Sequence, residues 1–449
     1  MCIDNTTDTV FALSTPVGGA IAVFRVTGSD SKRVLSEIFT GKIEPRLFSY
    51  GRLVDGENTI DEVMAVYFKG PASYTGEDMF EVSIHGSYAV SNAVSQLLAR
   101  KGLRMAAPGE FTKRAFMNGK MDLVQADAVM DLILSDTKRS ADAALEQLKG
   151  SLSREINSIE ELLIDFMSEL FAAMDYPEEM EDEVMSDAEH CLAKNISKIE
   201  ILINNGGHSR ILREGARVVI VGKPNVGKSS LMNVLTGTER AIVTKVAGTT
   251  RDIIEEKVDI CGIPVRLTDT AGMHDAQDEV EVIGIERAVE YAQTAEVILA
   301  MFDGTAEFSR WDCKIAEDYL GKNAIAVINK ADIDNEECEH KAELIHNMVN
   351  EAECIVISCE TGEGIDKLCS AICSRLGFSH GERAIVTNER HIECLIRARE
   401  DLIDAQAAGQ TDLAAVSVQS ALSHLGEITG REVGEDVLDR IFSRFCVGK

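Results

Sequence analysis

The stretch Gly222-Lys223-Pro224-Asn225-Val226-Gly227-Lys228-Ser229 decides the class of fold. An apolar run, Val218 to Val221, leads directly into it, and a strand followed by such a glycine-bearing turn predicts a phosphate-binding loop before a helix. In such a loop a lysine reaches the β- and γ-phosphates and a serine hydroxyl binds Mg²⁺, so we expect these roles for Lys228 and Ser229. A chance match is the alternative when the pattern stands alone.

Further motifs follow predicted strands in the order that a guanine-nucleotide switch protein requires. Thr249 and Thr250 lie where a switch loop would bring a hydroxyl to the metal, and Asp269-Thr270-Ala271-Gly272 would hold Mg²⁺ through water and face the γ-phosphate. Asn329-Lys330-Ala331-Asp332 offers a carboxylate that accepts both N–H groups of guanine, which adenine lacks. Ser358-Cys359-Glu360 would support the base through backbone N–H groups. Together these motifs predict guanine specificity.

The hydrolytic machinery differs from the Ras pattern. Met273 follows the glycine of the second motif, where Ras-type enzymes carry a glutamine that orients the attacking water, and a thioether cannot do this. The acidic segment Asp278-Glu279-Val280-Glu281 is the nearest supply of another group. Asn225 offers a side-chain carbonyl beside the phosphates, where a monovalent cation could replace an arginine finger; ordinary turn chemistry explains this asparagine equally well.

Composition excludes several classes of protein. The chain has 449 residues, of which 45% are hydrophobic, and no apolar run is long enough to cross a bilayer. The polar start, Met1 to Val10, resembles neither a secretory signal nor a transit peptide, so we expect a cytoplasmic protein. A net charge of −30 argues against a large nonspecific nucleic-acid surface. The 11 cysteines lack zinc-ligand spacing, and reduced thiols are expected.

The hydrophobic pattern divides the chain into segments. Residues 8–118 alternate as short strands do, and residues 122–210 are helical, with Ile156, Ile159, Leu163, Phe166 and Leu170 on one face. Strands and helices then alternate to about 376, as in a doubly wound parallel sheet. After Arg390 the pattern is helical again, with Leu402-Ile403 among the core candidates. Helices on both sides suggest that the α/β block is inserted into a helical domain.

Beyond these motifs the whole chain resembles one family. The resemblance is carried by the following stretches: Asp8-Thr9-Val10-Phe11-Ala12, Tyr74-Thr75-Gly76-Glu77-Asp78, Pro108-Gly109-Glu110-Phe111-Thr112, Ala115-Phe116-Met117-Asn118-Gly119-Lys120, Ile283-Gly284-Ile285-Glu286-Arg287 and Phe445-Cys446-Val447-Gly448-Lys449. In these residues the chain is similar to the MnmE (TrmE) family, bacterial GTPases of wobble-uridine modification in tRNA.

The resemblance implies a multidomain fold that is α+β and α/β. It comprises an N-terminal domain (1–119) that binds tetrahydrofolate and dimerises, a helical domain in two parts (120–213 and 378–449), and an inserted Ras-like GTPase domain (214–377). The implied one-carbon donor is 5,10-methylene- or 5-formyl-tetrahydrofolate. The folate site falls on Arg25, Glu81, Lys120 and Lys449, charges that suit a pterin ring and a glutamyl tail. Without the family these four residues would be interpreted as ordinary surface charges.

For the nucleotide site the resemblance adds metal ligands. It assigns K⁺ to Asn225, Thr244, Val246 and Thr249, Mg²⁺ to Ser229 and Thr250, and orientation of water to Glu281. Hydrolysis is then K⁺-dependent and driven by dimerisation of GTPase domains. The expected nucleotide-binding set is Asn225, Val226, Gly227, Lys228, Ser229, Ser230, Thr244, Lys245, Val246, Ala247, Gly248, Thr249, Thr250, Asp269, Thr270, Ala271, Gly272, Asn329, Lys330, Asp332, Ser358, Cys359 and Glu360.

The family likeness also implies partners. A homodimer would join the flavoprotein MnmG in a heterotetramer and add an aminomethyl or carboxymethylaminomethyl group at carbon 5 of the wobble uridine of tRNA. Cys446 becomes the candidate reactive thiol, because Arg444 and Lys449 would stabilise its thiolate; a small packing residue is the alternative. The chain carries no GxGxxG flavin motif, which places FAD and NADH on the partner.

Three positions depart from the family pattern, and two rival functions stay open. His274 and Glu255 stand where arginines are frequent, and Lys245 lies inside the expected cation loop, where it would repel K⁺. The first rival is a ribosome-assembly GTPase switch, which would need a basic RNA-binding module. The second is a folate-dependent transferase in which the GTPase domain only regulates; replacing Cys446 with Ser would then abolish modification and spare GTP hydrolysis.

Overall fold

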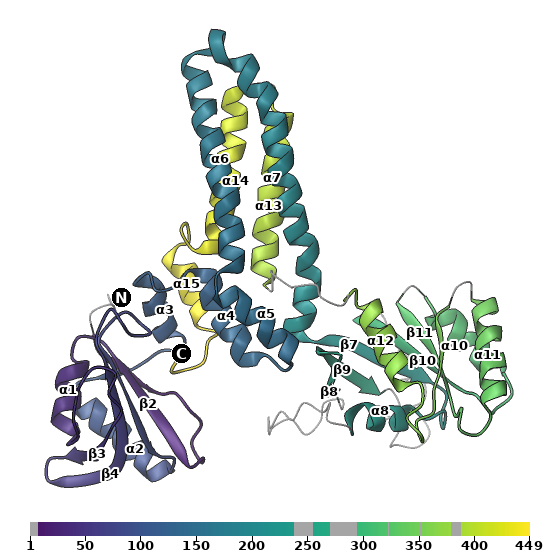
Figure 1. The fold of residues 1–449 in the computed structure, drawn as a ribbon, viewed down its shortest axis with the longest axis horizontal. Coiled ribbons are helices and arrows are strands. Elements are labelled where there is room, and N and C mark those ends of the chain that lie inside the picture. Colours follow the sequence, from purple (N-terminus) through teal and green to yellow (C-terminus); the bar gives the residue numbers. More distant parts are fainter. Residues whose placement is uncertain (1–7, 238–254, 270–293, 322, 350–351, 379–387) are drawn as a thin grey trace. The chain divides into compact units, whose positions relative to one another are not determined.

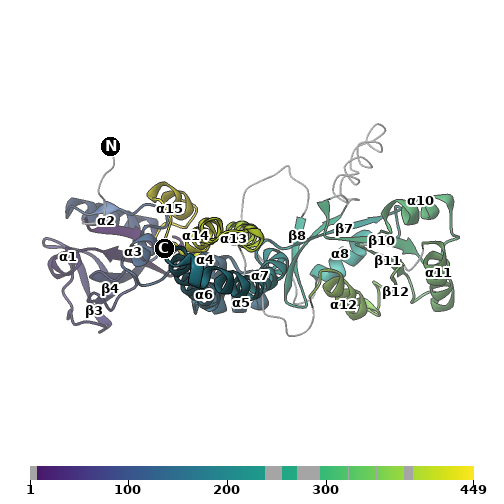
Figure 2. The same ribbon diagram turned by 90° about the horizontal axis from the view of Figure 1, so that it is seen from above.

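A computed structural model describes residues 8–237, 255–269, 294–321, 323–349, 352–378 and 388–449. The chain folds as two compact units (Figures 1 and 2). The first comprises Met1–Met130, Ser153–Ser168 and Ala415–Lys449, and the second comprises Asp131–Leu152 and Glu169–Ala414. This grouping differs from the four segments expected from the sequence, whose boundaries stay predictions.

The first unit contains a six-stranded sheet in the order β3-β4-β5-β2-β1-β6. Its neighbouring strands are antiparallel, except that β1 and β6 pair in parallel. The strands are β1 (Val10–Leu13), β2 (Ile21–Thr27), β3 (Ser49–Asp55), β4 (Asn58–Phe68), β5 (Met79–His85) and β6 (Arg104–Met105). The helices between them are α1 (Ser31–Ile38), α2 (Tyr88–Arg100) and α3 (Glu110–Met117).

The two faces of this sheet differ. Phe24, Val26 and Phe80 point to one face, where they form a core with the apolar sides of α1 and α2. Because side chains alternate along a strand, Arg25 and Glu81 belong to the opposite face. The sheet therefore uses one face for stability and leaves charged side chains on the other.

Seven helices of the described residues carry the helical segments predicted from the sequence. They are α4 (Leu123–Leu134), α5 (Lys138–Leu148), α6 (Ser151–Asp175), α7 (Pro177–Glu214), α13 (Glu389–Ala407), α14 (Thr411–Thr429) and α15 (Glu435–Phe442). The predicted stripe of α6 from Ile156 to Leu170 is buried. Within the second unit α13 packs along α7, as both views show (Figures 1 and 2). Ile403, which we predicted to be in the core, is 44% exposed, so that prediction is wrong.

The second unit contains a six-stranded sheet in the order β12-β11-β10-β7-β9-β8. All neighbours are parallel except β8 and β9, which form an antiparallel hairpin at the edge. Its elements are β7 (Ala216–Gly222), α8 (Lys228–Thr236), β8 (Glu255–Ile260), β9 (Ile263–Asp269), β10 (Val297–Asp303), α10 (Arg310–Tyr319), β11 (Ala324–Asn329), α11 (Asn335–Met348), β12 (Cys354–Val356) and α12 (Ile365–Arg375). The predicted doubly wound α/β block is confirmed.

This sheet has an apolar core on each face. Val218 and Ile220 of β7 belong to one core, whereas Val219 and Val221 belong to the other. A central parallel strand covered on both faces needs this continuous apolar run. Such a sheet places its binding loops at the carboxyl ends of the strands, where the predicted nucleotide motifs lie. Among the described helices none combines the length and apolar character that crossing a membrane would require.

Candidate active sites

The turn between β7 and α8 has the backbone of a phosphate-binding loop. Asn225 and Gly227 adopt positive φ angles of 63° and 106°. A Cβ atom added at Gly227 would lie 2.3 Å from Nδ2 of Asn329, so glycine is required there for space as well as for conformation. The loop delivers the chain into the N-terminus of α8, which begins at Lys228. Backbone N–H groups at such a terminus bind anions.

The ammonium group of Lys228 lies inside this loop. Its Nζ donates to the carbonyl oxygens of Gly222 at 2.8 Å and Lys223 at 2.7 Å, and the residue is only 6% exposed. The cation is thus held where phosphate oxygens would meet it. Ser229 and Ser230 follow on the exposed side of the first turn of α8, where a hydroxyl can reach a metal ion.

A second lysine, Lys223, connects the phosphate-binding loop to the start of α10. Nζ of Lys223 lies 2.6 Å from Oδ2 of Asp312 and donates to Oγ of Ser309 at 2.9 Å, at the start of α10. Burial acts to raise the pKa of Asp312, but Lys223 and the Ser309 hydrogen bonds outweigh it and hold that pKa below its ordinary value. Sequence reasoning missed this contact, because Lys223 is simply a variable position of the loop motif.

Asn329 joins three of the predicted motifs. Its Nδ2 donates to the carbonyl oxygen of Val226 at 3.0 Å, and its Oδ1 accepts from the backbone N–H of Cys359 at 3.1 Å. Asn329 is 3% exposed, so neither bond competes with much water. One buried amide therefore fixes the base-recognition loops against the phosphate loop.

The remaining members of the guanine motifs surround an exposed carboxylate. Oδ1 of Asp332 accepts from Oγ of Ser358 at 2.6 Å, and Asp332 itself is exposed to solvent, as is Glu360. Burial, together with the charge of Asp332, raises the pKa of Cys359 to about 11, which keeps this thiol protonated near neutral pH. The backbone N–H of Cys359 donates to Asn329, and the support that residues 358–360 would give to the base stays a prediction.

A second cluster of predicted residues lies on the charged face of the first sheet. Nε of Arg25 donates to Oε1 of Glu81 at 2.8 Å, and Nη1 donates to the carbonyl oxygen of Gly448 at 3.2 Å. The guanidinium lies 5.4 Å from the ring centroid of Tyr74 and 5.7 Å from that of Phe111. The Arg25–Glu81 ion pair thus lies next to two aromatic rings and the C-terminal backbone. Ligand sites commonly combine a few polar groups with apolar walls in this way.

The C-terminal tail reaches this cluster through its backbone. The carbonyl oxygen of Cys446 accepts from the N–H groups of Gly109 and Lys449, each at 3.3 Å, and Cys446 itself is exposed. Lys120 is not joined to Arg25 or Glu81; its Nζ donates to the carbonyl oxygen of Pro71 at 3.0 Å. The structure thus pairs Arg25 with Glu81 and bonds Arg25 to Gly448, the residue before Lys449, whereas Lys120 is bonded elsewhere.

Comparison with known proteins assigns the chain. The family model described as GTP-binding protein TrmE N-terminus matches residues 9–120, and the model described as MnmE helical domain matches residues 123–446. The tRNA modification GTPase MnmE of Alkaliphilus metalliredigens (strain QYMF) is 41% identical over 461 residues, which cover 98% of this chain and 99% of that protein. The chain belongs to the MnmE family.

Further relatives of the MnmE family agree. The tRNA modification GTPase MnmE of Natranaerobius thermophilus is 40% identical and covers 99% of this chain and 100% of its own length. Among solved structures, an Era variant of Aquifex aeolicus bound to GDP·AlF4⁻ aligns with 42% of this chain and 67% of its own at 30% identity, with a TM-score of 0.30. The sequence matches confirm the predicted family and, with it, a GTPase of tRNA modification.

Part of the site expected for an MnmE protein lies outside the described residues. This holds for Thr244, Lys245, Val246, Ala247, Gly248, Thr249, Thr250, Thr270, Ala271, Gly272, Glu281, Met273 and His274. Asp269 ends β9 and Glu255 begins β8, and only their backbones are described. Within the described part of the chain, His, Cys, Asp and Glu side chains form no group of three or more that could hold a metal ion.

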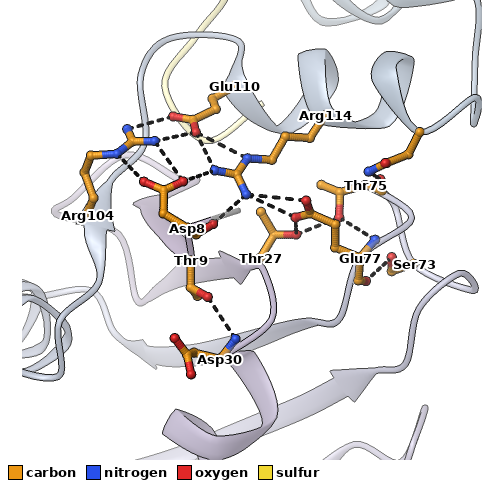
Figure 3. A network of polar contacts seen from close by, with 11 residues as sticks. Asp8, Thr9, Thr27, Asp30, Ser73, Thr75, Glu77, Arg104, Glu110 and Arg114 are labelled. Atoms are coloured by element: carbon orange, nitrogen blue, oxygen red, sulfur yellow. Dashed lines mark hydrogen bonds and ion pairs between the residues drawn. The ribbon is translucent and has the colours of Figure 1, made fainter. Parts of the chain in front are cut away.

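Arginine and carboxylate side chains of the first unit form a network of ion pairs around the buried Arg114 (Figure 3). The side chain of Arg114 is 6% exposed and lies 2.7 Å from Oδ1 of Asp8, 2.8 Å from Oε1 of Glu110 and 3.3 Å from Oε2 of Glu77. Arg104 contacts the carboxylates of Asp8 and Glu110 from the solvent side. Glu77 and Glu110 belong to motifs that carried the family resemblance, yet their pairing with arginines was not predicted.

The network fixes α3 to the sheet. Burial acts to raise the pKa values of Asp8 and Glu110, but hydrogen bonds and charges from Arg104 and Arg114 outweigh burial and lower both. Thr27 of β2 donates to Oε2 of Glu77 at 2.9 Å, which ties the Tyr74-to-Asp78 loop to the same cluster. Because Phe111 of α3 and Tyr74 of that loop flank Arg25, the network holds the walls of the candidate ligand site.

Proposed function

We propose that this chain hydrolyses GTP to drive modification of the wobble uridine of tRNA, with K⁺ and a tetrahydrofolate derivative as further ligands. The observation that carries the proposal is the Asn329 amide, which bonds the base loops to the phosphate loop. Such a site distinguishes guanine through Asp332 and holds the phosphates at Lys228 in one rigid unit. Family membership supplies tRNA as the substrate class.

The phosphate loop supports the metal assignments. Ser229 is exposed at the start of α8, where it would bind Mg²⁺ together with Thr250. Asn225 is exposed in the left-handed conformation beside the phosphate position, which suits a carbonyl ligand for K⁺. Family likeness adds Thr244, Val246 and Thr249 to the K⁺ set and Glu281 as the residue that orients water. A cation placed there would stabilise charge developing on the phosphates, as an arginine finger does.

The Arg25–Glu81 pair supports folate binding. A pterin ring presents adjacent N–H donors, which a carboxylate such as Glu81 can accept, while the glutamyl tail needs cations such as Arg25, Lys120 and Lys449. Tyr74 and Phe111 frame the guanidinium with flat apolar surfaces that suit an aromatic heterocycle. The residues present therefore fit the group. Cys446, exposed in the adjoining tail, is our candidate reactive thiol.

Dimerisation and the MnmG partner belong to the same proposal. The edge strand β3 and the residues before it expose Phe48 (52%), Tyr50 (63%) and Leu47 (39%), and apolar side chains at a sheet edge favour association. We therefore propose a homodimer through the N-terminal domain. FAD and NADH chemistry is assigned to MnmG. The domain boundaries at 119, 213 and 377 are part of this proposal.

The β8–β9 hairpin offers a route from nucleotide to helices. In sequence it joins the Thr249-Thr250 motif to the motif that begins at Asp269. Nζ of Lys257 on β8 lies 2.6 Å from Oδ2 of Asp136, and Oγ1 of Thr137 donates to the carbonyl oxygen of Gly262 at 2.7 Å. These contacts dock the hairpin on the N-terminus of α5, and they support transfer of nucleotide-dependent motion to the helical part.

Two measurements test the proposed function. Mass spectrometry of tRNA nucleosides should show loss of the modified wobble uridine in cells lacking this protein, restored by the wild type but not by Lys228→Ala. GTP turnover should be much faster in KCl than in NaCl at equal ionic strength. Unchanged nucleosides would refute the pathway, and equal rates in both salts would refute the cation mechanism.

A further inference from the structure

A buried lysine outside the nucleotide motifs forms a compact set of bonds near the guanine loops. Lys341 lies on α11 and is 3% exposed. Its Nζ donates to the carbonyl oxygens of Asp303 at 2.6 Å and Gly304 at 3.2 Å, and also to that of Ala306. An ammonium group has three N–H donors, and here three carbonyl oxygens from one loop accept them.

Burial of the Lys341 ammonium group costs free energy unless the loop carbonyl oxygens compensate it. Moving an ammonium group from water to an interior is strongly unfavourable without full compensation, and α11 could pack with an apolar side chain instead. Without Lys341 the carbonyl oxygens of Asp303, Gly304 and Ala306 would lose the one ammonium group that they share at the end of β10. Lys341 therefore acts as an internal cation around which residues 303–306 fold.

The 303–306 loop is in direct contact with the guanine motif. Oδ2 of Asp303 lies 2.5 Å from Nζ of Lys330, and the N–H of Gly304 donates to the carbonyl oxygen of Asn329 at 2.8 Å. Thr305 donates to Oδ1 of Asp303 through both its N–H and its hydroxyl. Burial acts to raise the pKa of Asp303, but Lys330 and Thr305 outweigh it, so this carboxylate stays ionised near neutral pH.

Lys330 needs this external support. Its φ angle is 79°, in the left-handed region that is unfavourable for a residue other than glycine. Space at the loop is equally restricted, because a Cβ atom on Gly304 would lie 2.0 Å from Sγ of Cys338 on α11. The same helix thus supplies both the cation and the steric wall that define the loop.

We propose that Lys341 is a positioning residue for guanine recognition: by gathering three carbonyl oxygens of the 303–306 loop, it holds Asp303 against Lys330 and Gly304 against Asn329. In this role Lys341 acts through the protein and not as a ligand of the nucleotide. This inference rests on the proposed guanine site and extends it to a residue that none of the nucleotide motifs includes. It predicts that Lys341 affects binding of the base but not binding of phosphates.

The test compares two ligands of the full-length protein. Lys341→Met keeps the length of the side chain and removes its donors. We expect its affinity for GDP, measured by calorimetry, to fall about tenfold to a hundredfold, the usual range for losing charged hydrogen bonds. Affinity for inorganic pyrophosphate, which occupies only the phosphate loop, should stay within about twofold. Lys367→Met, an exposed lysine on α12, is the matched control and should change neither ligand.

Further variants distinguish positioning from general stability. Lys341→Gln retains amide donors and should lie between wild type and Lys341→Met, which keeps the test decisive if the methionine variant folds poorly. At saturating GTP the kcat should be preserved while KM rises. Asp303→Asn combined with Lys341→Met should weaken GDP binding by less than the product of the single effects, because both act through Lys330.

Each result decides one question. Equal loss of GDP and pyrophosphate binding, or unchanged GDP binding in Lys341→Met, would overturn the positioning role. Independent, fully multiplicative effects of Asp303→Asn and Lys341→Met would overturn the route through Lys330. Failure of the wild-type protein to bind GDP would instead refute the proposed function, so the two failures are distinguishable.

Discussion

Replacing Arg114 with Leu should destabilise the N-terminal sheet by about 3 kcal/mol. Breaking a buried ion pair by removing one partner costs about 3–5 kcal/mol, since an uncompensated charge stays behind. Arg114 has three carboxylate partners, but Asp8 and Glu110 keep Arg104, and Glu77 keeps the Thr27 hydroxyl. The remaining partners place the expected loss at the low end of that range.

The matched variant is Arg104→Leu, which removes the outer arginine of the same cluster. Its side chain is 38% exposed, against 6% for Arg114, so water screens its contacts and can replace them. We expect a loss of about 1 kcal/mol. Arg33→Leu on α1, where both ion pairs are exposed, is the control and should have no measurable effect.

Hydrogen exchange of the backbone amides of β1 is the suitable assay. The single tryptophan, Trp311, lies in the other unit, and a melting curve of a protein with several domains cannot be assigned to one of them. Exchange of the amides of β1 reports the free energy of opening of the sheet next to Asp8. Equal losses in Arg114→Leu and Arg104→Leu would refute the argument from burial.

The same cluster predicts a pH dependence. Because the pKa values of Asp8 and Glu110 are lower in the folded state than their ordinary values of 3.8 and 4.5, their stabilising contribution is complete above those values. It is lost as the pH falls through the lower, folded-state pKa values. The penalty of Arg114→Leu should shrink in the same window, since a protonated carboxyl group needs no cation. A penalty that persists at acid pH would show that lost packing, not lost charge, is responsible.

Three further predictions concern the second unit. Asp332→Asn should weaken GDP binding at least tenfold and favour xanthosine nucleotides, because an amide offers a donor where guanine needs an acceptor; competition calorimetry checks this. Gly227→Ala should lower nucleotide affinity at least a hundredfold, since its Cβ would meet the Asn329 amide at 2.3 Å; retained affinity would contradict the loop geometry. Lys257→Met should change the rate of K⁺-stimulated GTP hydrolysis by no more than about twofold but reduce tRNA modification severalfold. The reversed pair, Asp136→Lys with Lys257→Asp, should restore modification. Unchanged tRNA nucleosides in the single variant would exclude the hairpin route.

Two kinds of element could be predicted from the sequence: strands that are covered on both faces, and helices with one buried stripe. The run from Val218 to Val221 is apolar at every position because both faces of β7 are covered, and α6 shows its buried stripe directly. β8 could not be predicted, because this edge strand begins with three charged residues, Glu255-Glu256-Lys257, and not with an apolar run. Ile403 was misplaced because an apolar pair on a helix does not reveal which member faces the neighbour.

Residues of the candidate sites also differ in whether the sequence predicts them. Loop residues such as Gly227 and Asn329 are set by local backbone requirements, so a motif predicts them. Lys341 and Arg114 act through buried charges whose partners lie on other elements, and a charged residue is normally expected at the surface. Only the fold shows that their charges are enclosed and paired. The segments that carry Thr250 and Glu281 lie outside the described residues, so their roles stay predictions.

The register of one strand pair connects the stability of the sheet to the geometry of the proposed folate site. Arg25 of β2 stands directly opposite Glu81 of β5, and the neighbouring pairs are Phe24 with Val82 and Val26 with Phe80. Because successive side chains point to opposite faces, burial of these apolar neighbours against α1 and α2 forces the ion pair onto the other face. A slip of one residue would bury Arg25 and expose Phe24. The hydrophobic core on one face of the sheet therefore determines where the Arg25–Glu81 pair lies on the opposite face.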